Sequence, residues 1–376
     1  MFILPFFLLS AIAGQLADMR DKARIIRIVK AAEIGIMLVG AAGLVLAWKG
    51  IAVTTAAIPL MLAALLGMGV HSTFFGPIKY SILPQHLHKG EVLAGTGLVE
   101  AGTYIAILAG TIVAGWIDVE WAALGVVLTA LVGFATSQFV PPAPPQIAPE
   151  PLDFHFVRSS IALVRNTTHD RRVFLAIMAI SFFWTIGAVL FIQFPPLAKN
   201  VLTASKEVAS LFLVIFSIGV SVGSLSVNAL LRGTVSARYS PVSVVVMGFF
   251  VLGFYLVCQA WTPHPGGALM DVSHFIAEPM AVPLMLCLLG IAVAGGMFVV
   301  PLYAFLTTFV DPTQTSRTIA ANNIVNSLAM VVGSLIATGL SMGGVPIIQQ
   351  LLLSAAMCLV SAQFARLLVN AERAAA

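Results

Sequence analysis

The stretch of sequence that decides the fold reads Gly14-Gln15-Leu16-Ala17-Asp18-Met19-Arg20-Asp21-Lys22-Ala23-Arg24. Apolar runs lie on both sides of it, which predicts a short loop between two membrane-spanning helices. Gly14 has no side chain, so two helices can approach closely there. Asp18 falls at a helix end, where its carboxylate can meet a cation or the N-terminus of a neighbouring helix. Basic residues such as Arg24 are expected to hold the loop on the cytoplasmic side.

The composition of the whole chain extends this interpretation. The chain has 376 residues, of which 60% are hydrophobic and 9% charged, and its mean hydropathy is +1.03. Soluble domains carry about 25% charged residues, so lipid must cover most of the outer surface of this protein. The net charge is only +4 and the basic residues are spread over short loops, which excludes nucleic acid as a partner.

Long apolar runs predict where the chain crosses the membrane. A helix needs about 20 apolar residues to cross the hydrocarbon core, and the runs are continuous rather than alternating, which favours helices over a β-barrel. Eleven runs qualify as expected spans, at about 1–17, 25–48, 51–78, 92–117, 121–140, 173–197, 207–231, 241–261, 280–309, 316–341 and 345–369.

The basic residues are distributed unevenly between the two sets of alternate loops. Of the 19 lysines and arginines, only Lys49, Lys199 and Lys206 belong to one set, and 16 belong to the other. Cytoplasmic loops carry the excess of basic residues. The sequence therefore predicts a cytoplasmic C-terminus, and with eleven spans this would place Met1 on the outer side. We interpret this odd count as the sign of a missing N-terminal helix.

A proline-rich segment divides the chain into two parts. Six prolines lie between residues 141 and 151, which predicts a stiff linker, and residues 154–165 are expected to form an amphipathic surface helix. The predicted domains are an N-terminal bundle of five spans (1–140), a cytoplasmic linker (141–171) and a C-terminal bundle of six spans (172–376). Weak similarity between the parts, such as Pro77 and Pro301 in corresponding runs, suggests two parallel repeats.

The loop at residues 14–24 resembles the signature G-x-L-A-D-r-x-G-r-k of the major facilitator superfamily (MFS). In that family it lies between the second and third helices, whereas here it follows the first expected span. The resemblance implies two parallel helical bundles that rock around a central cavity, with the family's first helix missing. The sequence departs from the signature at Asp21, where the family has glycine, and at Ala23, where it has a basic residue.

Three further stretches resemble the lysophospholipid transporter family more narrowly. They are residues 74–85 (Phe74-Phe75-Gly76-Pro77-Ile78-Lys79-Tyr80-Ser81-Ile82-Leu83-Pro84-Gln85), 98–103 and 317–326. That family includes transporter-like domains fused to acyltransferase and acyl-acyl-carrier-protein synthetase modules. The resemblance implies a bacterial inner-membrane flippase that moves lysophosphatidylethanolamine-type lipids inward for reacylation, without ATP or obvious ion coupling. An acyltransferase–synthetase is the protein partner that it implies.

Two other functions are compatible with the same sequence. One is a generic MFS transporter of another small amphiphile, and the other is a non-transporting membrane domain that presents lipid to an acyltransferase. Phosphate-binding loops of the Walker type, nucleophile elbows and catalytic dyads are missing from the sequence, so we predict no enzyme and no cofactor. His86 and His88 lack further ligands, and we predict no metal site.

Polar residues inside the expected spans are the candidates for substrate binding. Glu33 and Glu100 each lie about 12 Å from the cytoplasmic end of a span, where an ionisable group should face the cavity or a partner. Each could pair with Lys79, hold a headgroup amine or brace the bundle. Lys79 could contact a headgroup phosphate or extend to the interface. Asn322 and Asn326 could line the lipid path or join helices by hydrogen bonds.

A second set of residues is the candidate for a conformational gate. It comprises Gly14, Asp18, Arg24 and Arg317. Asp18 and Arg317 lie in different halves of the sequence but on the same predicted face of the membrane. We expect them to form a cytoplasmic latch that is closed when the protein faces outward; the alternative is two solvated loop charges.

Overall fold

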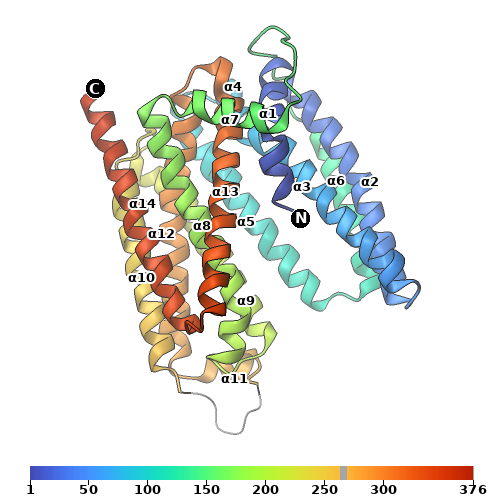
Figure 1. Cartoon of the computed structure of the whole chain (residues 1–376), viewed down its shortest axis with the longest axis vertical. Helices are drawn as coiled ribbons and strands as arrows, with labels where there is room; N and C mark the ends of the chain where they lie inside the picture. The colour runs from blue at the N-terminus through green and yellow to red at the C-terminus, as the bar shows by residue number, and fades with distance from the viewer. Residues whose placement is uncertain (263–268, 376) are drawn as a thin grey trace. The chain divides into compact units, whose positions relative to one another are not determined.

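The computed structural model describes residues 1–262 and 269–375, and these residues form helices with a single isolated β-bridge between Ala204 and Met270. Figure 1 shows the helices, coloured along the chain from blue at the N-terminus to red at the C-terminus. The prediction of an all-α membrane protein is confirmed. Within the described residues, ten helices are long and apolar enough to cross a membrane.

The first expected span is shorter than the others. Helix α1 (Leu4–Met19) has 16 residues, which corresponds to about 24 Å, whereas the hydrocarbon core is about 30 Å thick. It is therefore a short apolar helix outside the ten, and the count of eleven spans is not confirmed.

Contacts divide the described chain into two compact units, each assembled from several segments. Unit 1 comprises residues 1–87, 116–169 and 306–327, and unit 2 comprises residues 88–115, 170–305 and 328–376. These units do not follow the linear halves of the sequence, because α5 (Val92–Trp116) belongs mainly to unit 2 and α13 (Thr315–Met342) contributes to both. The division at residues 140 and 172 stays a prediction.

Unit 1 is built around the first helices of the chain. Helix α2 (Lys22–Trp48) packs against α3 (Ile58–Ser81) and α6 (Val119–Ser137), and α1 packs against α3 and α7 (Phe156–Thr167). A π-helical turn, η1 (Val53–Ala57), leads into α3, and the short α4 (Leu83–His86) follows it. The beginning of α13 joins this unit through an apolar cluster formed by Ala11, Leu163, Ala320, Ala321 and Ile324.

Helix α7 confirms the expected helix in the linker. Its residues Ser159, Ser160 and Leu163 are buried, and Ser160 donates a hydrogen bond to the backbone oxygen of Phe7 in α1. Ile161 is exposed on another face. The helix of the linker therefore packs against α1.

Unit 2 contains the remaining long helices, which are α8 (Arg171–Asn200), α9 (Lys206–Leu231), α10 (Ser240–Ala260), α12 (Ala281–Thr308) and α14 (Ile347–Ala375). Helix α14 packs against both α8 and α10. At one end, the rings of Phe194, Phe254 and Phe275 surround Phe212 at centroid distances of 5.7, 6.3 and 5.9 Å; Phe275 belongs to the short α11 (Val272–Ala277). Edge-to-face aromatic packing of this kind adds to the stability of an apolar core.

Candidate gate and polar sites

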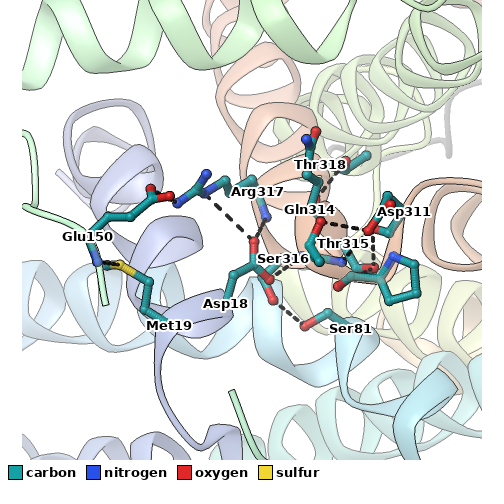
Figure 2. Close-up of polar contacts among 12 residues, drawn as sticks. Asp18, Met19, Ser81, Glu150, Asp311, Gln314, Thr315, Ser316, Arg317 and Thr318 are labelled. Atoms are coloured by element: carbon teal, nitrogen blue, oxygen red, sulfur yellow. Dashed lines mark hydrogen bonds and ion pairs between the residues drawn. The ribbon is translucent and has the colours of Figure 1, made fainter. Parts of the chain in front are cut away.

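The carboxylate of Asp18 binds the first residues of α13. Its two oxygens accept hydrogen bonds from the backbone N–H groups of Ser316 (3.0 Å) and Arg317 (3.1 Å), and Asp18 is completely buried (Figure 2). The first N–H groups of a helix have no partners within the helix and carry partial positive charge. A buried carboxylate at this position is therefore stabilised by both hydrogen bonds and the helix dipole.

Side chains around this contact extend the network. The guanidinium of Arg317 donates a hydrogen bond to Glu150 at 3.2 Å, and its Nε lies 3.9 Å from the Asp18 carboxylate. The hydroxyls of Ser81, at the end of α3, and Ser316 are 2.8 Å apart and hydrogen-bonded. We refer to Asp18, Ser81, Ser316 and Arg317 as the α1–α13 latch. It joins three helices of unit 1 (Figure 2).

Gly14 allows α1 to lie directly against α13. A Cβ atom at this position would be 2.6 Å from the Cβ of Ala320, 3.1 Å from the Cα of Arg317 and 3.1 Å from the backbone oxygen of Ser316. These distances are shorter than ordinary carbon contacts of about 3.5–4.0 Å. Residue 14 therefore has to be glycine for the latch to close in this form.

The turn between α1 and α2 explains the departure from the family signature at residue 21. Asp21 has φ −59°, a value open to any residue, and its side chain accepts a hydrogen bond from the N–H of Arg24 at the start of α2. The same carboxylate accepts from the N–H of Ala143 in the linker. Aspartate thus caps the helix where the family has glycine.

Arg24 differs from the other gate candidates. Its backbone N–H donates to Asp21, but its side chain is exposed. The structure brings Gly14, Asp18 and Arg317 together and leaves the guanidinium of Arg24 on the surface.

A short 3-10 turn, η2 (Pro312–Gln314), leads into α13. Asp311 precedes it and accepts hydrogen bonds from the hydroxyl and the backbone N–H of Thr313, at 2.6 and 2.8 Å. These hydrogen bonds, the hydroxyl first, hold the pKa of Asp311 below its usual range. The charged cap fixes the entry to α13 near the residues that bind Asp18.

The ion pair of Arg317 with Glu150 should contribute little to the latch. The side chain of Glu150 is 60% exposed, and exposed ion pairs contribute about 1 kcal/mol or less. We expect Glu150→Gln to change the thiol-labelling rate of a cysteine at position 81, which lies within the latch, by no more than about fivefold. A larger change would mean that the side-chain pair, rather than the backbone hydrogen bonds, holds the latch.

Among the substrate candidates, Glu33 has well-defined partners. Its carboxylate lies 2.7 Å from Nζ of Lys30 and 3.4 Å from Nε2 of His71 in α3. Lys79 lies on α3 as well, and its ammonium is 4.7 Å from the ring centroid of Tyr80. Neither Lys30 nor His71 was among the candidates derived from the sequence.

The remaining candidates lie in both units. Asn322 and Asn326 are buried in the part of α13 that belongs to unit 1. Glu100 is 1% exposed and lies on α5 in unit 2, one turn before the buried Tyr104. Four of the five predicted substrate residues therefore belong to unit 1, and their role in binding stays a prediction.

The residues missed by sequence reasoning are Ser81, Ser316, Glu150, Lys30 and His71. The spacing of Lys30 and Glu33 by three residues on one helix is a signal that sequence alone contains. The contact of His71 with Glu33 can be predicted only if it is known that α2 packs against α3. The contacts of Ser316 and Glu150 can be predicted only if it is known that α1 packs against α13 and the linker.

Sequence comparison places the chain among known transporters. The sequence model of the Major Facilitator Superfamily matches residues 1–334. The lysophospholipid transporter LplT of Cronobacter sakazakii is 24% identical over 333 residues, which are 86% of this chain and 72% of that protein. The LplT protein of Citrobacter koseri is 25% identical over 366 residues, covering 91% of this chain and 81% of that protein.

Solved structures of similar fold agree with this assignment. The human organic anion transporter MFSD10 has a TM-score of 0.74 at 14% identity, covering 97% of this chain and 82% of that one. A bacterial homologue of the iron transporter ferroportin has a TM-score of 0.69 at 13% identity, covering 98% and 88%. These likenesses confirm the predicted fold, and the match over residues 1–334 shows that this multi-pass membrane protein belongs to the Major Facilitator Superfamily.

Proposed function

We propose that this transporter moves lysophospholipids of the lysophosphatidylethanolamine type across the bacterial inner membrane. The observation that carries the proposal is the similarity to curated lysophospholipid transporters, which extends over 86% to 91% of the chain in the relatives described above. A match to a single domain or motif would support the fold only. The C-terminus would lie on the cytoplasmic side, with the excess of basic residues.

Two of the sequence stretches that resemble this transporter family meet in the structure. Ser81, in the stretch 74–85, is hydrogen-bonded to Ser316, which directly precedes the stretch 317–326. Gly76 lies more than one turn before Ser81 on α3, and a Cβ atom at Gly76 would lie 3.2 Å from the side-chain nitrogen of Asn323 on α13. The family-like stretch of α3 thus approaches the start of α13 at two places, which supports a shared function for these residues.

The chemistry of a lysolipid headgroup suits the candidate residues. Lysophosphatidylethanolamine carries an anionic phosphate, a cationic amine and one acyl chain. In our proposal, Lys79 contacts the phosphate, Glu33 or Glu100 attracts the amine, and the amides of Asn322 and Asn326 bond the polar linkage. Ionisable groups within membrane spans are costly and are therefore functional candidates by default.

Alternating access follows if the latch opens and closes. With residues 1–140 and 172–376 as two rocking bundles and 141–171 as the linker, the α1–α13 latch joins a helix of the first to a helix of the second. It would close the cytoplasmic end of the lipid path and open to release the lipid inward. The released lysolipid would be a substrate for an acyltransferase, which is the partner we propose.

A flip assay in liposomes tests this function. We expect purified protein to carry fluorophore-labelled lysophosphatidylethanolamine between leaflets, so that the fraction protected from a membrane-impermeant quencher changes faster than in protein-free liposomes. Arg24→Gln, which alters an exposed side chain, should retain this activity. Labelled phosphatidylethanolamine, which has two acyl chains, should move more slowly. A path that fits a lipid with one acyl chain would have to widen to let this lipid pass.

The outcomes separate the three functions. Transfer no faster than in protein-free liposomes would refute the flippase, and lipid binding without transfer would favour a lipid-presenting domain. Transfer of unrelated amphiphiles at the same rate as the lysolipid would favour a generic transporter.

A further inference from the structure

The inner face of α7 covers the line along which α1 meets the start of α13. Leu163 belongs to one apolar cluster with Ala11 of α1 and Ile324 of α13. Ser160 donates a hydrogen bond to the backbone oxygen of Phe7 in α1, at 3.3 Å. Helix α7 therefore contacts both helices of the latch within unit 1 (Figure 1).

The place of this contact along α1 indicates its depth in the membrane. Phe7 and Ala11 lie twelve and eight residues before Met19, where α1 ends, which corresponds to about 18 Å and 12 Å along the helix axis. The polar layer on each side of the hydrocarbon core is about 5–8 Å thick. If α1 ends at the outer limit of this layer, both residues lie below it. Helix α7 then lies at the boundary between headgroups and acyl chains, beside α1.

The outer face of α7 is both apolar and basic. At about 100° per residue, four side chains point within about 60° of the direction opposite to the buried face: Val157, Arg158, Ile161 and Arg165. Val157 and Ile161 are 52% and 62% exposed, and both arginines are exposed as well. Exposed apolar residues combined with arginines are typical of helices that lie in the membrane interface. We refer to these four residues as the outer face of α7.

The two arginines of the outer face differ in their partners. Arg158 donates from Nε and Nη2 to the carboxylate of Asp153, at 3.2 and 3.0 Å. Among the described residues, no acidic side chain forms an ion pair with Arg165. The positive charge of Arg165 is therefore left uncompensated by this part of the chain. A guanidinium binds phosphate oxygens through two parallel hydrogen bonds, so an anionic lipid headgroup complements this charge.

We propose that the outer face of α7 binds an anionic phospholipid, with Arg165 on the headgroup phosphate and Val157 and Ile161 among the acyl chains. The bound lipid holds α7 against α1 and α13 and thereby favours the closed latch. The reason is that Leu163 keeps its contacts with both helices only while they lie together. In the orientation proposed above, the lipid belongs to the cytoplasmic leaflet. The lipid stays at the surface of the protein, so the proposal does not depend on which lipid is transported.

Fluorescence quenching in nanodiscs tests the lipid contact. The three native cysteines are replaced by alanine, and a bimane fluorophore is attached to Ile161→Cys, Ala148→Cys or Leu128→Cys. Ala148 is exposed in the proline-rich part of the linker, and Leu128 is exposed in the middle of α6. Phospholipids with a nitroxide on the acyl chain should quench the labels at positions 161 and 128 and leave the label at position 148 bright. The lipid-binding face is overturned if the label at position 161 is quenched no more than that at position 148, because water or another protein then covers it.

The same labels test the headgroup preference. At equal mole fraction, nitroxide-labelled phosphatidylglycerol should be enriched over phosphatidylcholine beside Ile161→Cys by about fivefold, the gain in affinity from one basic residue near an anionic surface. Leu128→Cys, in the apolar middle of α6, should show no preference. Adding Arg165→Gln should remove the preference at position 161 and keep the quenching by both lipids, whereas Arg24→Gln should change neither. A preference that survives Arg165→Gln overturns the headgroup contact.

The effect of the lipid on the latch is measured at position 81. We expect Ser81→Cys to be labelled about fivefold more slowly in nanodiscs that contain phosphatidylglycerol than in phosphatidylcholine alone. Arg165→Gln should remove this difference, and Arg24→Gln should keep it. The thiol reagent is uncharged, so the charge of the membrane does not alter its local concentration. Equal labelling rates in the two lipid mixtures overturn the link between lipid binding and the latch.

Discussion

Asp18→Asn should raise the thiol-labelling rate of a cysteine at position 81 by about ten- to hundredfold. Each oxygen of Asp18 accepts one backbone N–H of α13. Asparagine keeps one acceptor but turns an NH₂ group toward the other N–H and removes the charge that the helix N-terminus stabilises. Hydrogen bonds to charged groups contribute about 1.5–3 kcal/mol, which corresponds to this range of rates. We expect the transporter to favour inward-facing states.

The measurement uses Ser81→Cys in a protein whose native cysteines, Cys258, Cys287 and Cys358, are replaced by alanine. Ser81 is 2% exposed, so its label is excluded while the latch is closed. Arg24→Gln is the matched control, since it removes a charge from the same turn without touching α13. If Asp18→Asn and Arg24→Gln label at the same rate as the parent protein, the latch has no gating role.

Gly14→Ala should prevent the latch from closing as it does here and slow lipid transfer severely. The new methyl group would lie 2.6 Å from the Cβ of Ala320 and 3.1 Å from two backbone atoms of α13. Overpacking of this kind costs about 1–3 kcal/mol, which shifts the balance between closed and open states by roughly 5- to 150-fold. Labelling at position 81 should therefore accelerate, and the leaflet-transfer assay should report the loss of turnover.

Two further variants identify the cause. Gly35→Ala also adds a methyl group to a helix, but no atom lies within 4 Å of it, so transfer should remain normal. Ala320→Gly removes the atom that the new methyl group meets first, and the double variant Gly14→Ala with Ala320→Gly should regain part of the activity. Normal transfer by Gly14→Ala alone would show that α1 and α13 need not approach this closely.

Helix positions could be predicted well from sequence, because hydropathy along a chain in lipid directly reports which segments cross. The ends of helices were predicted less well. Helix α2 begins at Lys22 rather than near residue 25, because Asp21 caps it and its first turn is polar. Helix α8 begins at Arg171, after the capping Asp170, for the same reason. Hydropathy cannot detect a helical turn that lies outside the apolar run.

The candidate gate could be predicted in part. The pairing of Asp18 with the start of α13 follows from the shared side of the membrane and from opposite charge. The atoms involved could not be predicted, because the strongest partners of the carboxylate are backbone N–H groups, which every non-proline residue has. The partners of Glu33 were missed for a different reason: His71 is a single polar residue in an apolar run, and its neighbour on α2 depends on the rotation of two helices about their axes.

The way Asp18 is bound also determines which substitutions the latch can tolerate over time. An interaction between two side chains is lost when either residue is substituted, and restoring it requires a matching substitution of the other residue. Here one partner is the peptide backbone of residues 316 and 317, so those positions can exchange one side chain for another and still present the same two donors. Proline is the exception, since it has no N–H. The latch therefore depends on the carboxylate of Asp18 and on the residue at which α13 begins.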